Sequence, residues 1–229
     1  MSRKKLIILA AILLAVILFL RLDLGRFLTL TSLKANRQAL LEFYAHHRVA
    51  MVAGFMVIYI VQTALSLPGA AVLSLAAGAI FGAVTGTVYA NIAATVGACL
   101  AFLATRYLLR DAVLARFGHR LEGLNRELEA RGLNYLLFLR LVPIFPFFLI
   151  NLAAGLTRLP LRTFFIATML GIIPGGFVYC NAGASLATVT SLSGIVSARV
   201  LGSFALLGLF ALVPALYAKW RIRGVPSGK

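Results

Sequence analysis

Residues 140–155 read Arg-Leu-Val-Pro-Ile-Phe-Pro-Phe-Phe-Leu-Ile-Asn-Leu-Ala-Ala-Gly, and they interrupt an apolar stretch that runs from Leu133 to Leu156. Each of the two prolines lacks an amide donor and disfavours helix at the residue before it. Basic residues flank both ends of the stretch, with Arg131 before it and Arg158 and Arg162 after it. Because cytoplasmic segments are enriched in Lys and Arg, both ends are expected in the cytoplasm. The stretch is therefore predicted to be a re-entrant hairpin.

The rest of the chain is equally apolar. Of its 229 residues, 62% are hydrophobic and 12% charged, whereas soluble domains have roughly 45–50% and about 25%. This composition excludes a soluble globular fold. The net charge of +16 on so apolar a chain indicates anionic lipid headgroups as partners and no nucleic acid. Since a crossing takes roughly 20 residues, we expect an all-α polytopic membrane protein.

The first apolar run, Leu6 to Leu20, follows basic residues and precedes no small-x-small cleavage pattern, so it is predicted to be an uncleaved signal anchor. The later apolar runs are Val49–Leu67, Ala70–Thr105, Leu133–Leu156, Leu161–Leu186 and Val200–Ala218.

The basic clusters assign sides to these runs. Clusters at residues 3–5, 106–131 and 219–229 indicate cytoplasmic N- and C-termini in a cell inner membrane. The chain must then cross an odd number of times between residues 49 and 105. One hairpin over 49–81 plus one span over 83–105 meets this condition, and three short crossings is the alternative. The full prediction is about four transmembrane helices plus two opposed re-entrant helical hairpins.

Two polar segments interrupt the apolar runs. Apolar residues from Leu114 to Leu128 alternate at three- and four-residue spacing, which predicts an amphipathic helix lying either on the membrane surface or against the end of the bundle. The segment from Arg21 to Arg48 carries five basic residues against Asp23 and Glu42. The predicted topology places this segment outside the cytoplasm, whereas the positive-inside rule alone would place it in the cytoplasm. The side of the membrane on which the segment lies is therefore left open.

A short repeat occurs at both predicted breaks. Leu-Ala-Ala-Gly ends at Gly78 and again at Gly155, and a proline precedes each of these glycines, Pro68 by ten residues and Pro146 by nine. With the topology above, the two halves form an inverted repeat of the kind found in transporters. Broken helices need partners for their free backbone groups, which predicts a shared polar cavity. We divide the chain into 1–48 (signal anchor and amphipathic segment), 49–186 (core with both hairpins) and 187–229 (C-terminal span and basic tail).

Four motifs between Val49 and Leu186 resemble the DedA superfamily, also called the VTT-domain or SNARE-associated Golgi protein family. They are Pro68-Gly with Ala-Ala-Gly78-x-x-Phe-Gly82, Arg106-x-x-x-Arg110-Asp111, Arg140-x-x-Pro143-x-x-Pro146 with Asn151 and Gly155, and Pro174-Gly175. The uninterrupted segment from Arg106 to Arg131 is most similar to the bacterial Tvp-like branch. The resemblance implies two opposed hairpins and the flipping or scrambling of lipids such as undecaprenyl phosphate or phospholipids. The likeness does not extend to the membrane acids that some members use, since Gln62 stands where they often carry a carboxylate.

Arg140 is the leading candidate for binding an anionic lipid. A guanidinium within an apolar hairpin is costly unless paired, and no acid follows it in the chain. The alternative is that Arg140 snorkels to the cytoplasmic headgroups. Asn151 needs partners for its amide, either hairpin backbone or substrate.

The remaining candidates have lesser or structural roles. Arg106, Gln62 and Asn181 are further candidates for lipid binding, and Arg110 and Asp111 are expected in an interfacial cluster. The expected structural residues of the hairpins are Pro68, Gly69, Gly78, Pro143, Pro146, Gly155 and Pro174.

Two functions are compatible with this sequence. The first is translocation of an anionic lipid across the bilayer, and the alternative is a non-transporting membrane factor that binds lipids or partners to support envelope integrity. We expect no enzyme activity, because the histidines lie outside the apolar runs and carboxylates are not clustered there. No cofactor or metal is expected, and the oligomeric state is left open.

Overall fold

The computed structural model describes residues 3–21, 23, 29–110, 113, 132–141 and 145–188. All regular elements in these ranges are helices, which agrees with the predicted all-α class. They are α1 (Arg3–Arg21), α2 (Leu30–His46), α3 (Arg48–Ala64), α4 (Ala70–Phe81), α5 (Ala83–Ala104), the π-helical turn η2 (Thr105–Leu109), an unlabelled helix Gly132–Leu141, α7 (Phe147–Leu156), α8 (Leu161–Gly171) and α9 (Ile173–Thr188). The predicted span Val200–Ala218, the amphipathic segment after Leu114, Asp111 and Pro143 lie outside the described residues.

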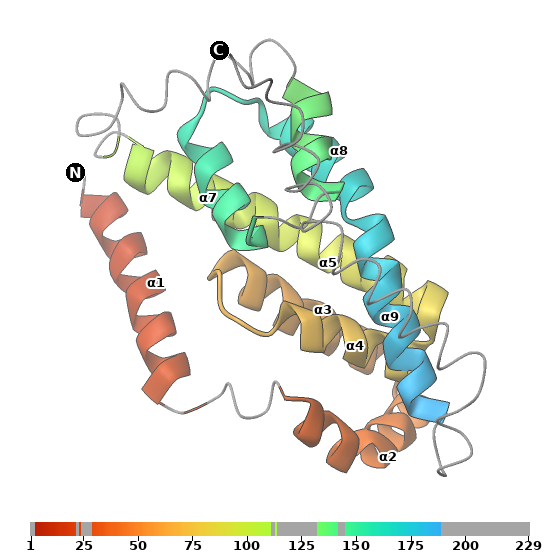
Figure 1. The fold of residues 1–229 in the computed structure, drawn as a ribbon. Helices are drawn as coiled ribbons and strands as arrows, with labels where there is room; N and C mark the ends of the chain where they lie inside the picture. Colours follow the sequence, from red (N-terminus) through yellow and green to blue (C-terminus); the bar gives the residue numbers. More distant parts are fainter. Residues whose placement is uncertain are drawn as a thin grey trace, which may run out of the picture.

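Helix α5 is the central element of the bundle. It runs through the molecule with α3 and α4 packed on it from the first half and α7, α8 and α9 from the second (Figure 1). Together with η2 it covers Ala83–Leu109, 27 residues, which is about 40 Å and exceeds a hydrocarbon core of about 30 Å. By length and composition it is the single helix of the described part that can cross a membrane unaided.

The predicted breaks in the first half are present. Helix α3 ends at Ala64 and α4 begins at Ala70, with Ser66 and Gly69 between them at φ angles of 56° and 116°. Gly82, at φ 83°, separates α4 from α5. Positive φ angles are accessible to glycine without steric cost, so these two glycines allow three helices to form within one apolar run.

The last described span of the second half is bent. The run Leu161–Leu186, predicted to cross the membrane once, contains two helices, α8 and α9, at an angle of 40° to each other. The bend lies at Ile172, two residues before Pro174, which has no amide hydrogen and clashes with the carbonyl four residues earlier. Counting this bent pair as one span gives at most two membrane-length helices in the described part of the chain.

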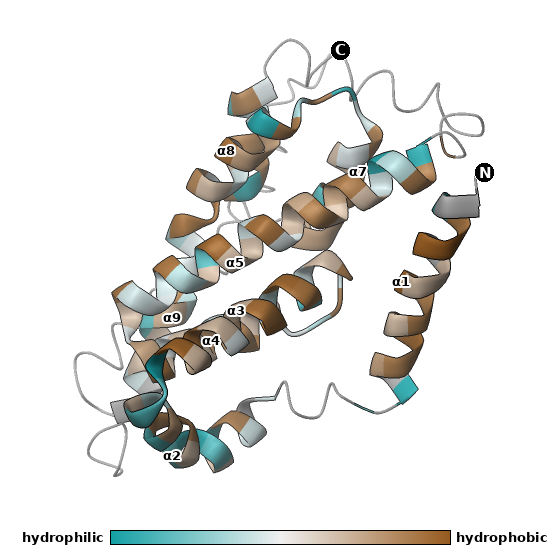
Figure 2. Ribbon diagram, turned by 180° about the vertical axis from the view of Figure 1, so that it is seen from behind, coloured by the Kyte–Doolittle hydropathy of each residue, from teal (hydrophilic) through white to brown (hydrophobic). Residues whose placement is uncertain are grey.

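Helix α2 lies at the end of the bundle. The side chain of Thr29 caps its N-terminus by accepting a hydrogen bond from Ser32 N at 3.2 Å. Tyr44 packs edge-on against Phe81 of α4, with ring centroids 5.1 Å apart. Figure 2 shows hydrophilic residues along α2, whereas α3, α4 and α5 are mostly hydrophobic. Within the polar segment, residues 30–46 thus form a helix that is anchored to the core by an aromatic contact.

The two Leu-Ala-Ala-Gly repeats pack in a crossed manner. Gly78 of α4 contacts α9, where an added Cβ would collide with the backbone of Cys180. Gly155 of α7 contacts α5, where an added Cβ would lie 2.5 Å from the carbonyl oxygen of Phe102 and 2.9 Å from Thr105 Cβ. Each short helix therefore packs against a long helix of the other half, and the repeat glycines set the distance of approach.

This packing predicts that Gly78→Ala and Gly155→Ala destabilise the fold. Forcing a methyl group into either backbone contact costs about 1–3 kcal/mol, which for a chain of this size lowers the melting temperature by roughly 2–12 °C. The matched control is Gly54→Ala in α3, where an added Cβ meets nothing within 4 Å. Thermal unfolding in detergent should show the two repeat variants below wild type and the control at or above it; equal melting temperatures for all three variants would contradict the crossed packing.

Candidate functional site

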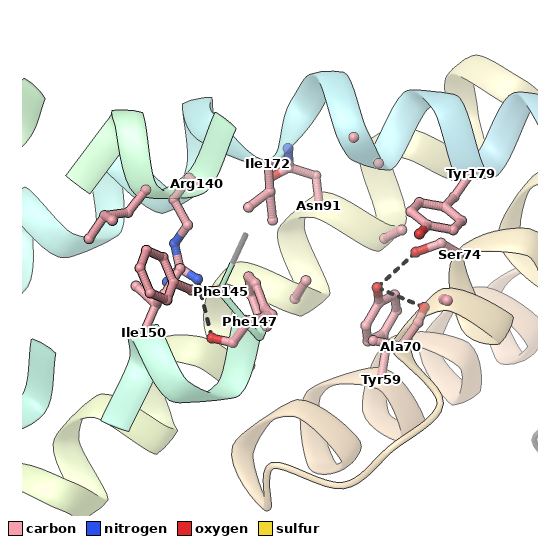
Figure 3. A pocket seen from close by; sticks show the side chains of 16 residues that line it. Tyr59, Ala70, Ser74, Asn91, Arg140, Phe145, Phe147, Ile150, Ile172 and Tyr179 are labelled. Carbon is pink, nitrogen blue, oxygen red and sulfur yellow. Dashed lines mark hydrogen bonds between the residues drawn. The ribbon is translucent and has the colours of Figure 1, made fainter. Parts of the chain in front are cut away.

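A cavity of about 290 Å³ lies between the two halves of the chain (Figure 3). Tyr59, Ser74 and Asn91 come from the first half, and Arg140 and Phe147 come from the second. The first residues of α4, Ala70 and Ala71, and the first of α7, Phe147, are part of its wall. The N-termini of both short helices thus face the cavity, where helix dipoles favour negative charge.

Arg140 lies at one end of this cavity and is 7% exposed. Its Nη2 donates to Asn151 Oδ1 at 2.6 Å and to Thr168 Oγ1 at 3.0 Å, and its Nη1 donates to the carbonyl of Phe147 at 3.5 Å. Arg140 and Asn151, both predicted as site residues, are therefore brought together. The guanidinium is held inside the protein, in an arrangement other than snorkelling.

Aromatic and small residues complete the surroundings of Arg140. Its Cζ lies 4.4 Å from the ring centroid of Phe147 and 5.2 Å from that of Phe164, within the range of cation–π attraction. A Cβ added at Gly171 would lie 2.5 Å from Arg140 Cβ. Glycine at 171 therefore leaves the space through which the arginine stem passes.

The charge of Arg140 has no carboxylate partner in the described part of the chain. The acidic residues there are Asp23 and Glu42, and the partners of Arg140 are an amide, a hydroxyl, a carbonyl and two rings. Arg140 Nε and Asn151 Nδ2 are buried and have no hydrogen-bond partner among the described residues. A buried charge and unpaired buried donors are each costly. Arg140 is the cavity-lining residue of this group, so this end of the cavity is positively charged.

Three hydroxyl groups, those of Tyr59, Ser74 and Tyr179, lie at the opposite end of the cavity (Figure 3). Tyr59 Oη lies 2.9 Å from Ser74 Oγ and 3.3 Å from the carbonyl oxygen of Ala70. The Tyr59–Ser74 pair was not among the predicted candidates, although Ser74 precedes Leu-Ala-Ala-Gly in the first repeat as Asn151 does in the second. In each half, the polar residue before the repeat holds a side chain of the preceding helix, Tyr59 in α3 or Arg140 in Gly132–Leu141, at the cavity wall.

Asn91 of α5 lies between the two ends (Figure 3). Its Nδ2 donates to the carbonyl of Met169 at 3.0 Å, and its Oδ1 accepts from Thr95 Oγ1 at 3.3 Å. This side chain was not among the predicted candidates, since a single asparagine in a Gly/Ala-rich span carries no distinguishing pattern. It ties α5 to α8 beside the cavity.

Arg106 and Arg110, in contrast, bind the end of α7. Arg106 Nη2 donates to the carbonyls of Thr157 and Leu159 at 2.8 and 2.7 Å, and its Nε donates to that of Gly155 at 3.4 Å. Arg110 Nε donates to the carbonyl of Leu156 at 3.3 Å. The last carbonyls of a helix lack intrahelical partners and favour cations. The structure thus places Arg106 in a clamp on α7 and outside the cavity lining.

The other predicted binding residues also lie outside the cavity lining. Gln62 is buried; its Nε2 donates to the carbonyl of Leu67 and its Oε1 accepts from Thr63 Oγ1 at 3.1 Å. Gln62 therefore supplies a hydrogen-bond donor to a backbone carbonyl of the turn that follows α3. Asn181 lies on α9, where its carbonyl accepts from Ser185 Oγ at 2.8 Å. No group of three His, Cys, Asp or Glu side chains within the described ranges could hold a metal ion.

The clamp predicts a loss of stability in Arg106→Ala. Hydrogen bonds to a charged group contribute about 1.5–3 kcal/mol, so the variant should melt at least several degrees below wild type, with faster amide exchange near the end of α7. Arg106→Lys should recover only part of this stability, because an ammonium cannot reproduce the fork of a guanidinium. Arg162→Ala, which removes an exposed arginine of α8, is the control and should melt like wild type. Wild-type melting and exchange in Arg106→Ala would show that the clamp is unimportant.

Comparison with known proteins gives a family. The VTT domain model matches residues 67–185. The chain is 30% identical to an Arabidopsis thaliana protein described as an uncharacterized membrane protein, over 85% of this chain and 69% of that one. It is 30% identical to the Dictyostelium discoideum transmembrane protein 41 homolog over 74% of this chain and 52% of the relative, and 24% identical to human transmembrane protein 41B over 81% and 65%.

The chain thus spans between half and about two thirds of the length of these three relatives. No solved structure matches it. The VTT match includes both Leu-Ala-Ala-Gly repeats, Arg140 and Asn151, so it covers the crossed glycine contacts and all the residues that line the cavity except Tyr59. The chain is a membrane protein of the VTT-domain family, part of the DedA superfamily.

Proposed function

We propose that this protein translocates an anionic lipid across the bilayer by lodging the headgroup in the cavity between its two halves. The observation that carries the proposal is the buried guanidinium of Arg140, which has no carboxylate partner in the described part of the chain and whose Nε, like the neighbouring Asn151 Nδ2, has no hydrogen-bond partner there. If the site served only to stabilise the fold, pairing this charge with a carboxylate or replacing it with an apolar side chain would make the protein more stable. A phosphate oxygen would accept from such donors.

The size of the cavity fits a headgroup rather than a whole lipid. Its volume of about 290 Å³ is near the lower end of ligand pockets, about 300–1,000 Å³. A second cavity of about 200 Å³ shares Leu139, Phe145 and Ile150 with the first and is lined almost entirely by apolar side chains. Phe145, at their junction, is 49% exposed. These cavities support a pose with the headgroup beside Arg140 and the first part of an acyl chain in the apolar cavity.

The short helices support a path for the headgroup. Helices α4 and α7 have 12 and 10 residues, about 18 and 15 Å, which is too short to cross the hydrocarbon core. We place them as the return arms of two re-entrant hairpins that enter from opposite sides of an inner membrane, with the chain termini in the cytoplasm. Both arms begin at the cavity wall. Because one hairpin would enter from each side of the membrane, a headgroup in the cavity would contact both hairpins and could be passed from one leaflet to the other.

The proposal predicts that Arg140→Gln slows lipid translocation. Losing a charge-assisted contact of about 1.5–3 kcal/mol should reduce the rate for a fluorescent anionic phospholipid in proteoliposomes about 10- to 150-fold. Arg162→Gln, on the exposed face of α8, is the control and should retain the wild-type rate. If wild type does not accelerate translocation, or if Arg140→Gln is as fast as wild type, a non-transporting membrane factor becomes the better account.

The opposed hairpins predict opposite accessibility of the two breaks. Single cysteines replace exposed residues, Pro68→Cys and Phe148→Cys, in a background with Cys99 and Cys180 changed to alanine. A membrane-impermeant thiol reagent should modify Pro68→Cys from the outside and Phe148→Cys only after it is admitted to the cytoplasmic side. Modification of both positions from one side would overturn the inverted arrangement.

A further inference from the structure

We propose that the hydroxyl pair of Tyr59 and Ser74 binds the uncharged, hydroxyl-bearing part of the headgroup whose phosphate lies at Arg140. The preferred ligand would then be an anionic phospholipid with a polyol headgroup, such as phosphatidylglycerol. This inference rests on the proposed function and adds the class of headgroup. It comes from the hydrogen-bonding character of the two ends of the cavity.

The Arg140 end supplies donors. The guanidinium carries five N–H groups and no acceptor, and its Nε and the nearby Asn151 Nδ2 are unused among the described residues. A ligand group at this end should therefore be rich in acceptors and negatively charged, as a phosphate is.

The Tyr59–Ser74 end supplies acceptors. Both side chains are buried and line the cavity. Tyr59 has one hydroxyl hydrogen, and either hydroxyl could be the donor in the bond between Tyr59 and Ser74. In the arrangement that makes both bonds, Tyr59 donates to the carbonyl of Ala70 and Ser74 donates to Tyr59. Both hydroxyl hydrogens are then used, and Ser74 Oγ keeps free lone pairs. A ligand group at this end should therefore be a donor.

A hydroxyl fits this end better than an ammonium group. The cavity lining contains one charged residue, Arg140, and no carboxylate within the described part of the chain. An ammonium taken out of water without a counter-charge carries a large desolvation cost, whereas a hydroxyl carries a much smaller one. The phosphatidylethanolamine headgroup is therefore disfavoured relative to glycerol.

The two ends face a single ligand. In Figure 3 the Arg140 and Tyr59–Ser74 groups lie at opposite ends of one cavity, with Phe147 and Asn91 between them. The polar anchors of the two ends, Asn151 and Ser74, stand at the same position of the two repeats. A headgroup that places its phosphate at one end can extend its hydroxyls toward the other.

The test measures binding to the full-length purified protein by calorimetry, with soluble dihexanoyl phosphatidylglycerol, phosphatidic acid and phosphatidylethanolamine below their micelle concentrations. Wild type should bind phosphatidylglycerol most tightly. The double variant Tyr59→Phe/Ser74→Ala should lose about tenfold in affinity for phosphatidylglycerol, as expected for one or two hydrogen bonds. Its affinity for phosphatidic acid, which has no headgroup hydroxyl beyond the phosphate, should change less than about twofold.

The decisive readout is the ratio of the affinities for phosphatidylglycerol and phosphatidic acid, because damage to the fold would weaken the binding of both lipids alike. Ser74→Ala alone should shift the ratio in the same direction by a smaller factor and serves if the double variant does not fold. Tyr89→Phe is the matched control, since Tyr89 packs on Phe81 outside the cavity lining, and it should leave the ratio unchanged.

Three outcomes would overturn the inference. They are equal wild-type binding of phosphatidylglycerol and phosphatidic acid, a ratio unaffected by Ser74→Ala and the double variant, or binding of phosphatidylethanolamine as tight as that of phosphatidylglycerol. Arg140→Gln separates this failure from that of the proposed function. Suppose that Arg140→Gln weakens the binding of both anionic lipids, while Ser74→Ala and the double variant leave the ratio of the two affinities unchanged. Only the hydroxyl subsite then fails. If Arg140→Gln weakens neither, or if wild type binds no lipid, both proposals fail.

Discussion

The burial of one positive charge governs the arrangement of the second half. Arg140 is 7% exposed, and its contacts come from two other helices: Asn151 and Phe147 of α7, and Thr168 and Phe164 of α8, whose Gly171 leaves room for the arginine stem. The idealised cost of moving an ion of this size into a dry interior is of order 20 kcal/mol, and several kcal/mol remain after relaxation. Amide, hydroxyl and ring contacts offset part of that cost without neutralising the charge. The structure therefore keeps, at the junction of its halves, a buried positive charge with no carboxylate partner in the described part of the chain.

That junction is held by contacts that are themselves crossed between the halves. Gly78 packs on α9 and Gly155 packs on α5. Arg106 and Arg110, just after α5, donate hydrogen bonds to backbone carbonyls in the last turn of α7 and in the residues that follow it. Because Phe102 both lies under the guanidinium of Arg106 and accepts the close approach of Gly155, the clamp and the glycine contact reinforce each other. The position of α7, and with it that of Asn151 and Phe147, is thus fixed from the first half of the chain. Movement between the halves would alter both ends of the cavity together.

The local breaks could be predicted from the sequence because proline and glycine act on their own backbone. The bounds of α3, α4 and α5 follow from Leu67-Pro68-Gly69 and Gly82. Arg140 and Asn151 were singled out from charge and position, and the structure brings them into contact.

Features that depend on contacts between distant segments could not be predicted. The pairing of Tyr59 with Ser74, the contribution of Thr168 and the role of Arg106 as a clamp need the three-dimensional arrangement of the two halves. Arginine and glutamine in an apolar sequence look alike whether they face a ligand or satisfy free carbonyls, which is why Arg106 and Gln62 were assigned to the lipid site.

The most direct test of this account is the rate of anionic-lipid translocation by Asn151→Asp in proteoliposomes. The substitution is nearly isosteric and puts a carboxylate at the atom that now lies 2.6 Å from Arg140 Nη2, so it neutralises the guanidinium while keeping its contact. We predict a protein at least as stable as wild type, in which translocation of the anionic lipid falls by at least about tenfold, because the ligand must now compete with an internal counter-charge. A wild-type rate in a stable Asn151→Asp protein would contradict the claim that the uncompensated charge of Arg140 binds the headgroup.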